Sequence, residues 1–73
     1  MPLDTRKRTA IVLNGEPAET AAATLAELLA ELGFAEAQVA TALNGDFVPR
    51  AARAATRLGP GDRVEIVAPR QGG

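Results

Sequence analysis

Residues 24–34, TLAELLAELGF, carry the clearest structural pattern in the chain. Leucines recur there at positions i, i+3, i+4 and i+7, a spacing that places them on one side of a helix. The four are Leu25, Leu28, Leu29 and Leu32. The pattern predicts an amphipathic helix over residues 25–32 whose leucine stripe lies in the core.

Both ends of this helix carry signals of their own. Thr24 with Glu27 three residues later predicts a capping box at the start. Gly33 is typical of the left-handed residue that ends a helix, and Phe34 is placed to pack back on Leu29. The boundaries are therefore predicted by local chemistry as well as by periodicity.

The segment before the helix predicts a β-hairpin. Residues 9–13 form a short apolar run, and Asn14-Gly15 is the strongest short signal for a type I′ turn. Residues 16–20 then form the return strand. Pro17 has no N–H to donate, so this strand is expected at an edge of the sheet.

The segment after the helix is less clear, because three alanines within residues 37–42 also suit a helix. The tight turn Asn-Gly-Asp at residues 44–46 favours strands on both sides, over residues 39–43 and 47–48. The alanine-rich residues 51–57 are expected to form one helical turn.

The last element follows a Gly-Pro-Gly-Asp turn at residues 59–62. Residues 63–68 alternate, with Val64, Ile66 and Ala68 on one face, and Pro69 ends the strand. The first and last strands are the most continuously apolar, so we expect them side by side at the centre. One amphipathic helix across a mixed sheet, an α+β domain, is the economical way to bury the leucines.

Composition excludes several functions for this 73-residue chain, whose net charge is −1. It has no Cys, His or Ser, so disulfides, thiolate–metal sites and the usual nucleophiles are missing, and we expect no enzyme activity. Phe34 and Phe47 are its only aromatic residues, and its only basic cluster is at residues 6–8, unlike a nucleic-acid-binding face. No apolar stretch approaches a membrane span, and the N-terminus lacks the features of a signal peptide, so we expect a soluble cytoplasmic protein.

The terminal Gly72-Gly73 is the candidate reactive group. From Pro69 onward, five residues reach at most about 17 Å when extended, enough to enter a narrow active site. Glycine lacks a Cβ, so both residues can be closely approached by another backbone. The carboxyl carbon of Gly73 is correspondingly open to a nucleophile.

Four segments, in their order and spacing, resemble the ThiS family of thiamine-pathway sulfur carriers. The resemblance covers about residues 9–73 and rests on several shared features together. The segments are IVLNGEPAET, TLAELLAELG, VATALNGDFVPR and LGPGDRVEIVAPRQGG.

The resemblance implies a ubiquitin-like β-grasp fold and a cycle of sulfur transfer. A ThiF-type enzyme would use ATP and magnesium to adenylate the carboxylate of Gly73, and a persulfide-derived sulfur would displace AMP to leave a thiocarboxylate. A ThiG-type thiazole synthase would then receive the sulfur. The carrier itself is expected to bind no cofactor and to be a monomer when free, with no nucleic-acid or membrane partner.

Carried onto this sequence, the resemblance makes Gly73 the attachment site and has Gly72 and Gln71 thread into the partner. Arg70 and Arg50 are candidate partner contacts. A mobile surface charge is an equally supported role for Arg70, and a solvated or locally paired charge is at least as well supported for Arg50. Phe47 and Val48 could form an apolar docking patch, but we expect them in the core.

We expect three regions: a disordered N-terminal extension at residues 1–8, a β-grasp domain at 9–68 and a flexible tail at 69–73. Family members usually begin almost at the first strand, so the extension departs from the pattern. Three other functions stay open: a carrier for another acceptor, such as a MoaD-type subunit or a tRNA-thiolation carrier; a ubiquitin-like modifier; and an interaction domain in which the tail plays no part.

Overall fold

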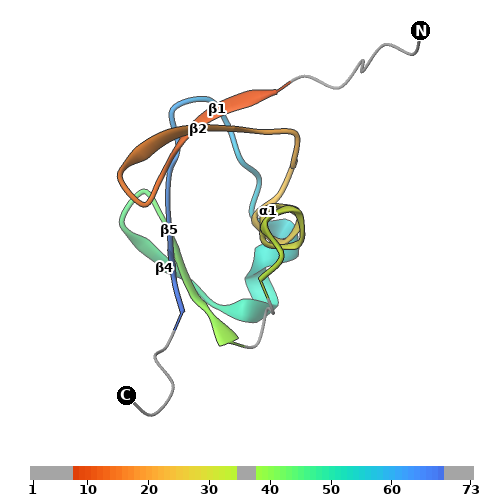
Figure 1. The fold of residues 1–73 in the computed structure, drawn as a ribbon. Helices are drawn as coiled ribbons and strands as arrows, with labels where there is room; N and C mark the ends of the chain where they lie inside the picture. Colours follow the sequence, from red (N-terminus) through yellow and green to blue (C-terminus); the bar gives the residue numbers. More distant parts are fainter. Residues whose placement is uncertain (1–7, 35–37, 69–73) are drawn as a thin grey trace, which may run out of the picture.

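The computed structural model describes residues 8–34 and 38–68. Five strands form one mixed sheet, and an α-helix and a short 3-10 helix complete the fold (Figure 1). This is the expected α+β, β-grasp architecture. In chain order the elements are β1 (Thr9–Leu13), β2 (Glu16–Thr20), α1 (Leu25–Leu32), β3 (Ala40–Leu43), β4 (Asp46–Val48), η2 (Arg50–Ala55) and β5 (Arg63–Val67).

The strand order is β2-β1-β5-β3-β4. The last strand lies at the centre beside β1, to which it is parallel, while β3 runs antiparallel to it. Both predictions for the sheet are confirmed: the first and last strands are neighbours, and the strand that contains Pro17 is at an edge. Pro17 pairs with Val12 across the hairpin.

The two ends of α1 confirm the predicted caps. The Thr24 Oγ1 accepts a hydrogen bond from the Glu27 N–H at 3.2 Å. In a capping box the Glu27 side chain would accept from the N–H of the N-cap residue, Thr24. Here its Oε1 accepts instead from the N–H of the preceding residue, Ala23, at 2.8 Å. At the other end Gly33 has φ 83°, and the N–H of Phe34 donates to the Leu29 carbonyl at 3.0 Å.

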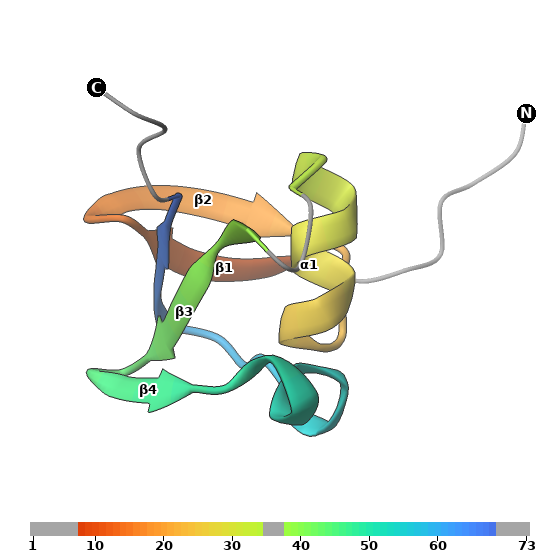
Figure 2. The same ribbon diagram turned by 90° about the horizontal axis from the view of Figure 1, so that it is seen from below.

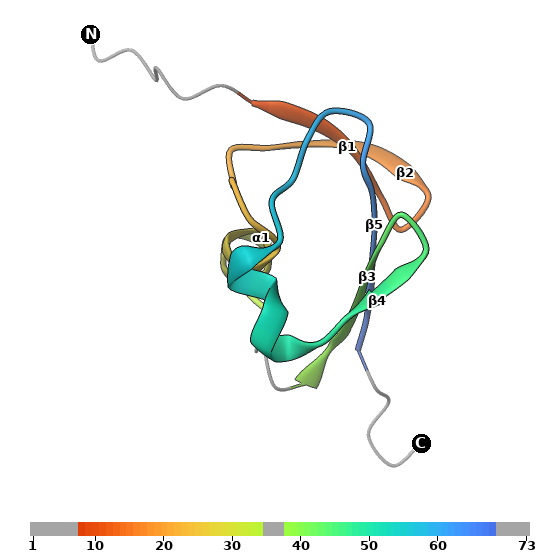
Figure 3. The ribbon, with the colours of Figure 1, turned by 180° about the vertical axis from the view of Figure 1, so that it is seen from behind.

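The sheet and the helices form two layers. Figure 2 shows α1 standing against one face of a strongly twisted sheet, and Figure 3 shows η2 beside α1 on that same side. An isolated bridge between Thr24 and Arg57 ties the start of α1 to the chain beyond η2. We call the face that α1 covers the inner face and the opposite one the outer face.

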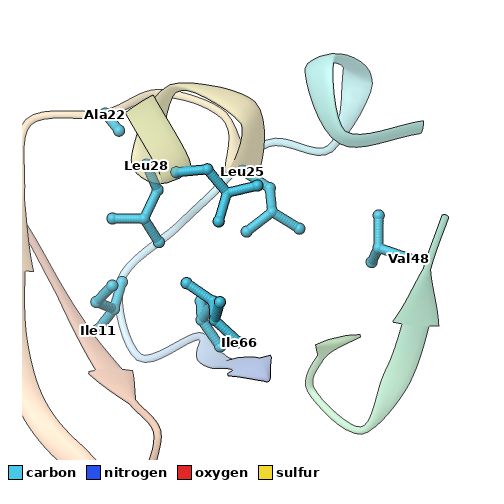
Figure 4. Close-up of a cluster of buried hydrophobic side chains, with 8 residues drawn as sticks. Ile11, Ala22, Leu25, Leu28, Val48 and Ile66 are labelled. Carbon is cyan, nitrogen blue, oxygen red and sulfur yellow. The ribbon is translucent and has the colours of Figure 1, made fainter. Parts of the chain in front are cut away.

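The core lies between α1 and the inner face (Figure 4). Its buried apolar residues are Ile11, Ala22, Leu25, Leu28, Leu29, Val48, Val64 and Ile66. The prediction that the whole leucine stripe lies in the core is wrong for Leu32. Leu32 is 41% exposed, because periodicity alone takes no account of where a helix ends relative to the sheet. Ala68, predicted to share a face with Val64 and Ile66, lies one residue beyond the end of β5 and is exposed.

Turns of the predicted types connect the strands. Asn14-Gly15 and Asn44-Gly45 both have positive φ at both residues, as a type I′ turn requires. The Gly59–Asp62 turn closes with a 3.2 Å hydrogen bond from the Asp62 N–H to the Gly59 carbonyl. The two Asn-Gly turns join β1 to β2 and β3 to β4, and the Gly59–Asp62 turn leads into β5.

Candidate functional site

The predicted reactive end of the chain lies outside the described residues. This applies to the attachment residue Gly73, to Gly72 and Gln71, and to Arg70. Their roles therefore stay predictions. What the structure places is the strand that leads into them, since β5 ends at Val67 and Pro69 follows two residues later.

The end of β5 is paired with β3. Val67 lies opposite Ala40, the first residue of β3, and Ile66 lies opposite Thr41. On the other side of β5, the Oδ1 of Asn14 accepts a hydrogen bond from the Ile66 N–H at 2.9 Å. The strand that leads into the tail is consequently held from both sides up to its last residues.

An apolar patch lies on the outer face next to this strand end. Phe47 is 69% exposed and Val67 is 62% exposed. Ala42 pairs with Phe47, and Ala40 pairs with Val67, so two small residues lie between the two large ones. We call these four residues the apolar patch.

The expectation that Phe47 packs in the core is wrong, whereas for Val48 it is correct. Val48 is buried opposite Thr41, which is itself buried on the inner face. Successive strand residues point to opposite faces, so Phe47 must point outward once Val48 points inward. The three residues of β4 form too short an alternating pattern to predict which side chains face the core.

Charged residues border the apolar patch. Glu65 pairs with Ala42 and is exposed on the outer face, as is Arg63 two residues before it in β5. An uncovered apolar surface with a charged border is typical of a protein-binding surface rather than of a small-molecule pocket.

The two arginines of η2 differ in burial. Arg50, a predicted partner contact, is exposed at the first residue of η2. Arg53 is buried, and its Nε donates to the Thr41 Oγ1 at 3.0 Å while its Nη2 donates to the Val39 carbonyl at 2.7 Å. The Thr41 hydroxyl in turn donates a hydrogen bond to the Val48 carbonyl in β4 at 2.8 Å.

The burial of Arg53 is not predictable from its sequence context. Nothing in the alanine-rich RAARAA segment distinguishes it from Arg50, because both are arginines among small residues. The structure distinguishes Arg53 by its hydrogen bonds to Thr41 and Val39, which lie 12 and 14 residues earlier in the chain. Arg53 therefore holds the start of β3, the strand that lies between the end of β5 and β4.

Comparison with known proteins gives the family. A sequence model of the ThiS family matches residues 11–73. The chain belongs to the ThiS family. It is a ubiquitin-like sulfur carrier with the β-grasp fold, and the family match includes the terminal Gly72-Gly73 and the β5 strand that precedes it.

Solved structures agree with this assignment. A crystal structure of the thiamine biosynthesis protein ThiS from Geobacter metallireducens has 35% sequence identity with this ThiS-family chain and a TM-score of 0.74, covering 89% of this chain and 100% of the Geobacter chain. An NMR solution structure of a thiamine biosynthesis protein from the same organism has the same identity and TM-score, covering 89% and 88%. A comparison with curated proteins found no match.

Two further observations concern residues 8–34 and 38–68. Over these ranges no group of three or more His, Cys, Asp or Glu side chains is arranged to hold a metal ion. Nor is any helix within them long and apolar enough to cross a membrane.

Proposed function

We propose that this ThiS-family chain carries sulfur for thiamine biosynthesis as a thiocarboxylate on Gly73. The observation that carries the proposal is the family match, which runs through the C-terminal Gly-Gly. The Geobacter proteins of the same fold are named for thiamine biosynthesis. The absence of Cys from the sequence is compatible with this role, because the chain's terminal carboxylate holds the sulfur.

The chemistry requires activation before sulfur transfer. A carboxylate is a poor electrophile, so a ThiF-type enzyme would use ATP and magnesium to convert it to an acyl adenylate, with release of pyrophosphate. The outer sulfur of a persulfide then attacks the acyl carbon and expels AMP, giving an acyl disulfide. A thiol reduces the S–S bond to leave the thiocarboxylate, which a ThiG-type synthase would consume.

We further propose that the activating enzyme binds the apolar patch. The patch and the tail share β5, because Val67 belongs to the patch and the tail begins two residues later. An enzyme that covers Phe47 and Val67 would therefore hold the body of the carrier close to where the tail must enter its active site. Exposed aromatic anchors are common at the centre of such interfaces.

The deciding experiment is the intact mass of the full chain after incubation with ATP, magnesium, a ThiF-type enzyme, a persulfide donor and a thiol. The expected result is a gain equal to sulfur replacing oxygen. The matched control is a chain that lacks only Gly73, in which the gain should be lost. No gain with a demonstrably active cognate enzyme would contradict the proposal, and reduction-resistant conjugates to lysines of other proteins would favour a ubiquitin-like modifier instead.

A further inference from the structure

The central strand β5 is held differently by its two neighbours. On one side, pairing with β3 continues to Val67, which lies opposite Ala40. On the other side, the register with β1 ends where Leu13 lies opposite Val64, because β1 turns away into its hairpin. Beyond Val64, backbone pairing with β1 no longer supports β5.

The side chain of Asn14 continues the support that the backbone of β1 stops giving. The N–H of Asn14 donates to the Val64 carbonyl at 2.8 Å. Its Oδ1 then accepts from the Ile66 N–H at 2.9 Å, and its Nδ2 donates to the Ile66 carbonyl at 3.3 Å. A carboxamide presents the same donor and acceptor as a peptide unit, so Asn14 serves Ile66 as a neighbouring strand would.

The second hairpin provides a natural counterpart at the opposite end of β5. Asn44 has nearly the same φ as Asn14, 53° against 50°. Its Oδ1 accepts from the Arg63 N–H at 2.8 Å, and its Nδ2 donates to the Asp62 Oδ1 at 3.1 Å. Asn44 thus holds the beginning of β5, whereas Asn14 holds the end.

We propose that Asn14 is a positioning residue for sulfur-carrier chemistry. It fixes the end of β5 at Ile66, three residues before Pro69 and seven before Gly73. In this proposal, a fixed end of β5 limits the directions in which the chain leaves the sheet, so that the Gly73 carboxylate meets ATP in the activating enzyme more readily. This inference rests on the proposed function, since it assigns Asn14 to that same reaction.

The test compares Asn14→Gly with Asn44→Gly in the full chain. Glycine accepts the positive φ at both turn positions, so each variant loses one side chain and keeps its turn. Amide hydrogen exchange of the free protein is measured first. Asn14→Gly should speed exchange at Ile66 about tenfold, the scale of one lost hydrogen bond, and Asn44→Gly should do so at Arg63 instead.

Steady-state adenylation is measured next with the ThiF-type enzyme. Asn14→Gly should lower kcat about tenfold and leave KM nearly unchanged, because the apolar patch that binds the enzyme is intact while fewer docked carriers present their carboxylate. Asn44→Gly should leave both constants near those of the native chain. Asn14→Asp, which keeps an acceptor for the Ile66 N–H, should restore part of the kcat.

The outcomes separate this inference from the proposed function. If the native chain is adenylated and the two glycine variants have equal kcat, Asn14 does not position the tail and the inference is wrong. Unchanged exchange at Ile66 in Asn14→Gly would overturn it as well, whatever the kinetics. If the native chain is never adenylated, the proposed function falls, and with it the role of Asn14 in that reaction.

Discussion

The two faces of the sheet differ in whether their apolar residues are buried. On the inner face, Val64 and Ile66 of β5 are buried beneath α1. On the outer face, Val67 of the same strand and Phe47 of β4 are exposed. Neighbouring residues of one strand thus serve two purposes: the inner ones stabilise the fold, and the outer ones form a surface that residues 8–34 and 38–68 leave uncovered. Four predictions test this division, from the largest expected effect to the smallest.

The inner face should show the largest loss of stability. Leu29 is completely buried, so Leu29→Ala should lower the free energy of unfolding by about 2–5 kcal/mol, through lost burial and the cavity left behind. Urea denaturation measures the change. Leu32→Ala on the same helix is the matched control, and its loss should be less than half as large because Leu32 is partly exposed. Equal losses would contradict the described packing of α1.

Arg53 should contribute to the fold although it is charged. Arg53→Met keeps most of the side-chain volume but leaves the Val39 carbonyl without this hydrogen bond, which should cost about 1–3 kcal/mol. Denaturation of Arg57→Met, which alters an exposed arginine just beyond η2, should give a change within about 0.5 kcal/mol. If both variants are equally stable, Arg53 is not the support that its contacts indicate.

A substitution on the outer face should weaken binding to the activating enzyme and leave the stability of the fold almost unchanged. Phe47→Ala should weaken binding to the ThiF-type enzyme by about 1–2 kcal/mol, roughly tenfold or more, while the unfolding midpoint stays close to that of the native chain. Isothermal titration calorimetry measures the affinity. Phe34→Ala removes the other phenylalanine, which follows α1 on the helix side, and should bind normally. Normal binding by Phe47→Ala would exclude the apolar patch as the docking surface.

The smallest expected effect concerns the cap that holds α1 over the inner face. Thr24→Ala removes the acceptor for the Glu27 N–H and should destabilise the protein by about 1 kcal/mol. Thr24→Ser keeps a hydroxyl and should be nearly neutral. Thermal unfolding followed by circular dichroism distinguishes the two variants. If the alanine variant is as stable as the serine variant, the cap does not stabilise the protein.

Local chemistry explains why most elements could be predicted from the sequence. The helix bounds at Leu25 and Leu32 agree with the prediction, because the cap, the leucine spacing and Gly33 all act within a few residues of each other. The two Asn-Gly turns likewise specify their own hairpins. For the ambiguous alanines before Asn44, that turn favoured a strand, and Ala40 and Ala42 lie in β3 while Ala37 lies outside the described residues.

The errors arise where a residue's environment depends on distant segments. Leu32 and Phe47 are both apolar, but Leu32 lies at the end of α1 and Phe47 on the sheet face opposite to the buried Val48, so both are exposed. Arg53 could not be predicted to be buried, because its partners Thr41 and Val39 lie more than ten residues earlier. For the candidate site, the sequence pointed to Gly73 through a short motif, but it gave no indication of the Asn14 contact with Ile66, which joins residues 52 apart.

The sequence by itself determined most of the secondary structure, the absence of Cys, His and Ser, and the chemical character of the C-terminus. Each of these depends on residue type and on spacings of a few residues. The tertiary structure alone decided which apolar residues α1 covers, which arginine is buried, and which side chain holds the end of β5. Those outcomes depend on contacts between segments far apart in the chain, and they form only when the sheet, the helix and the hairpins pack together.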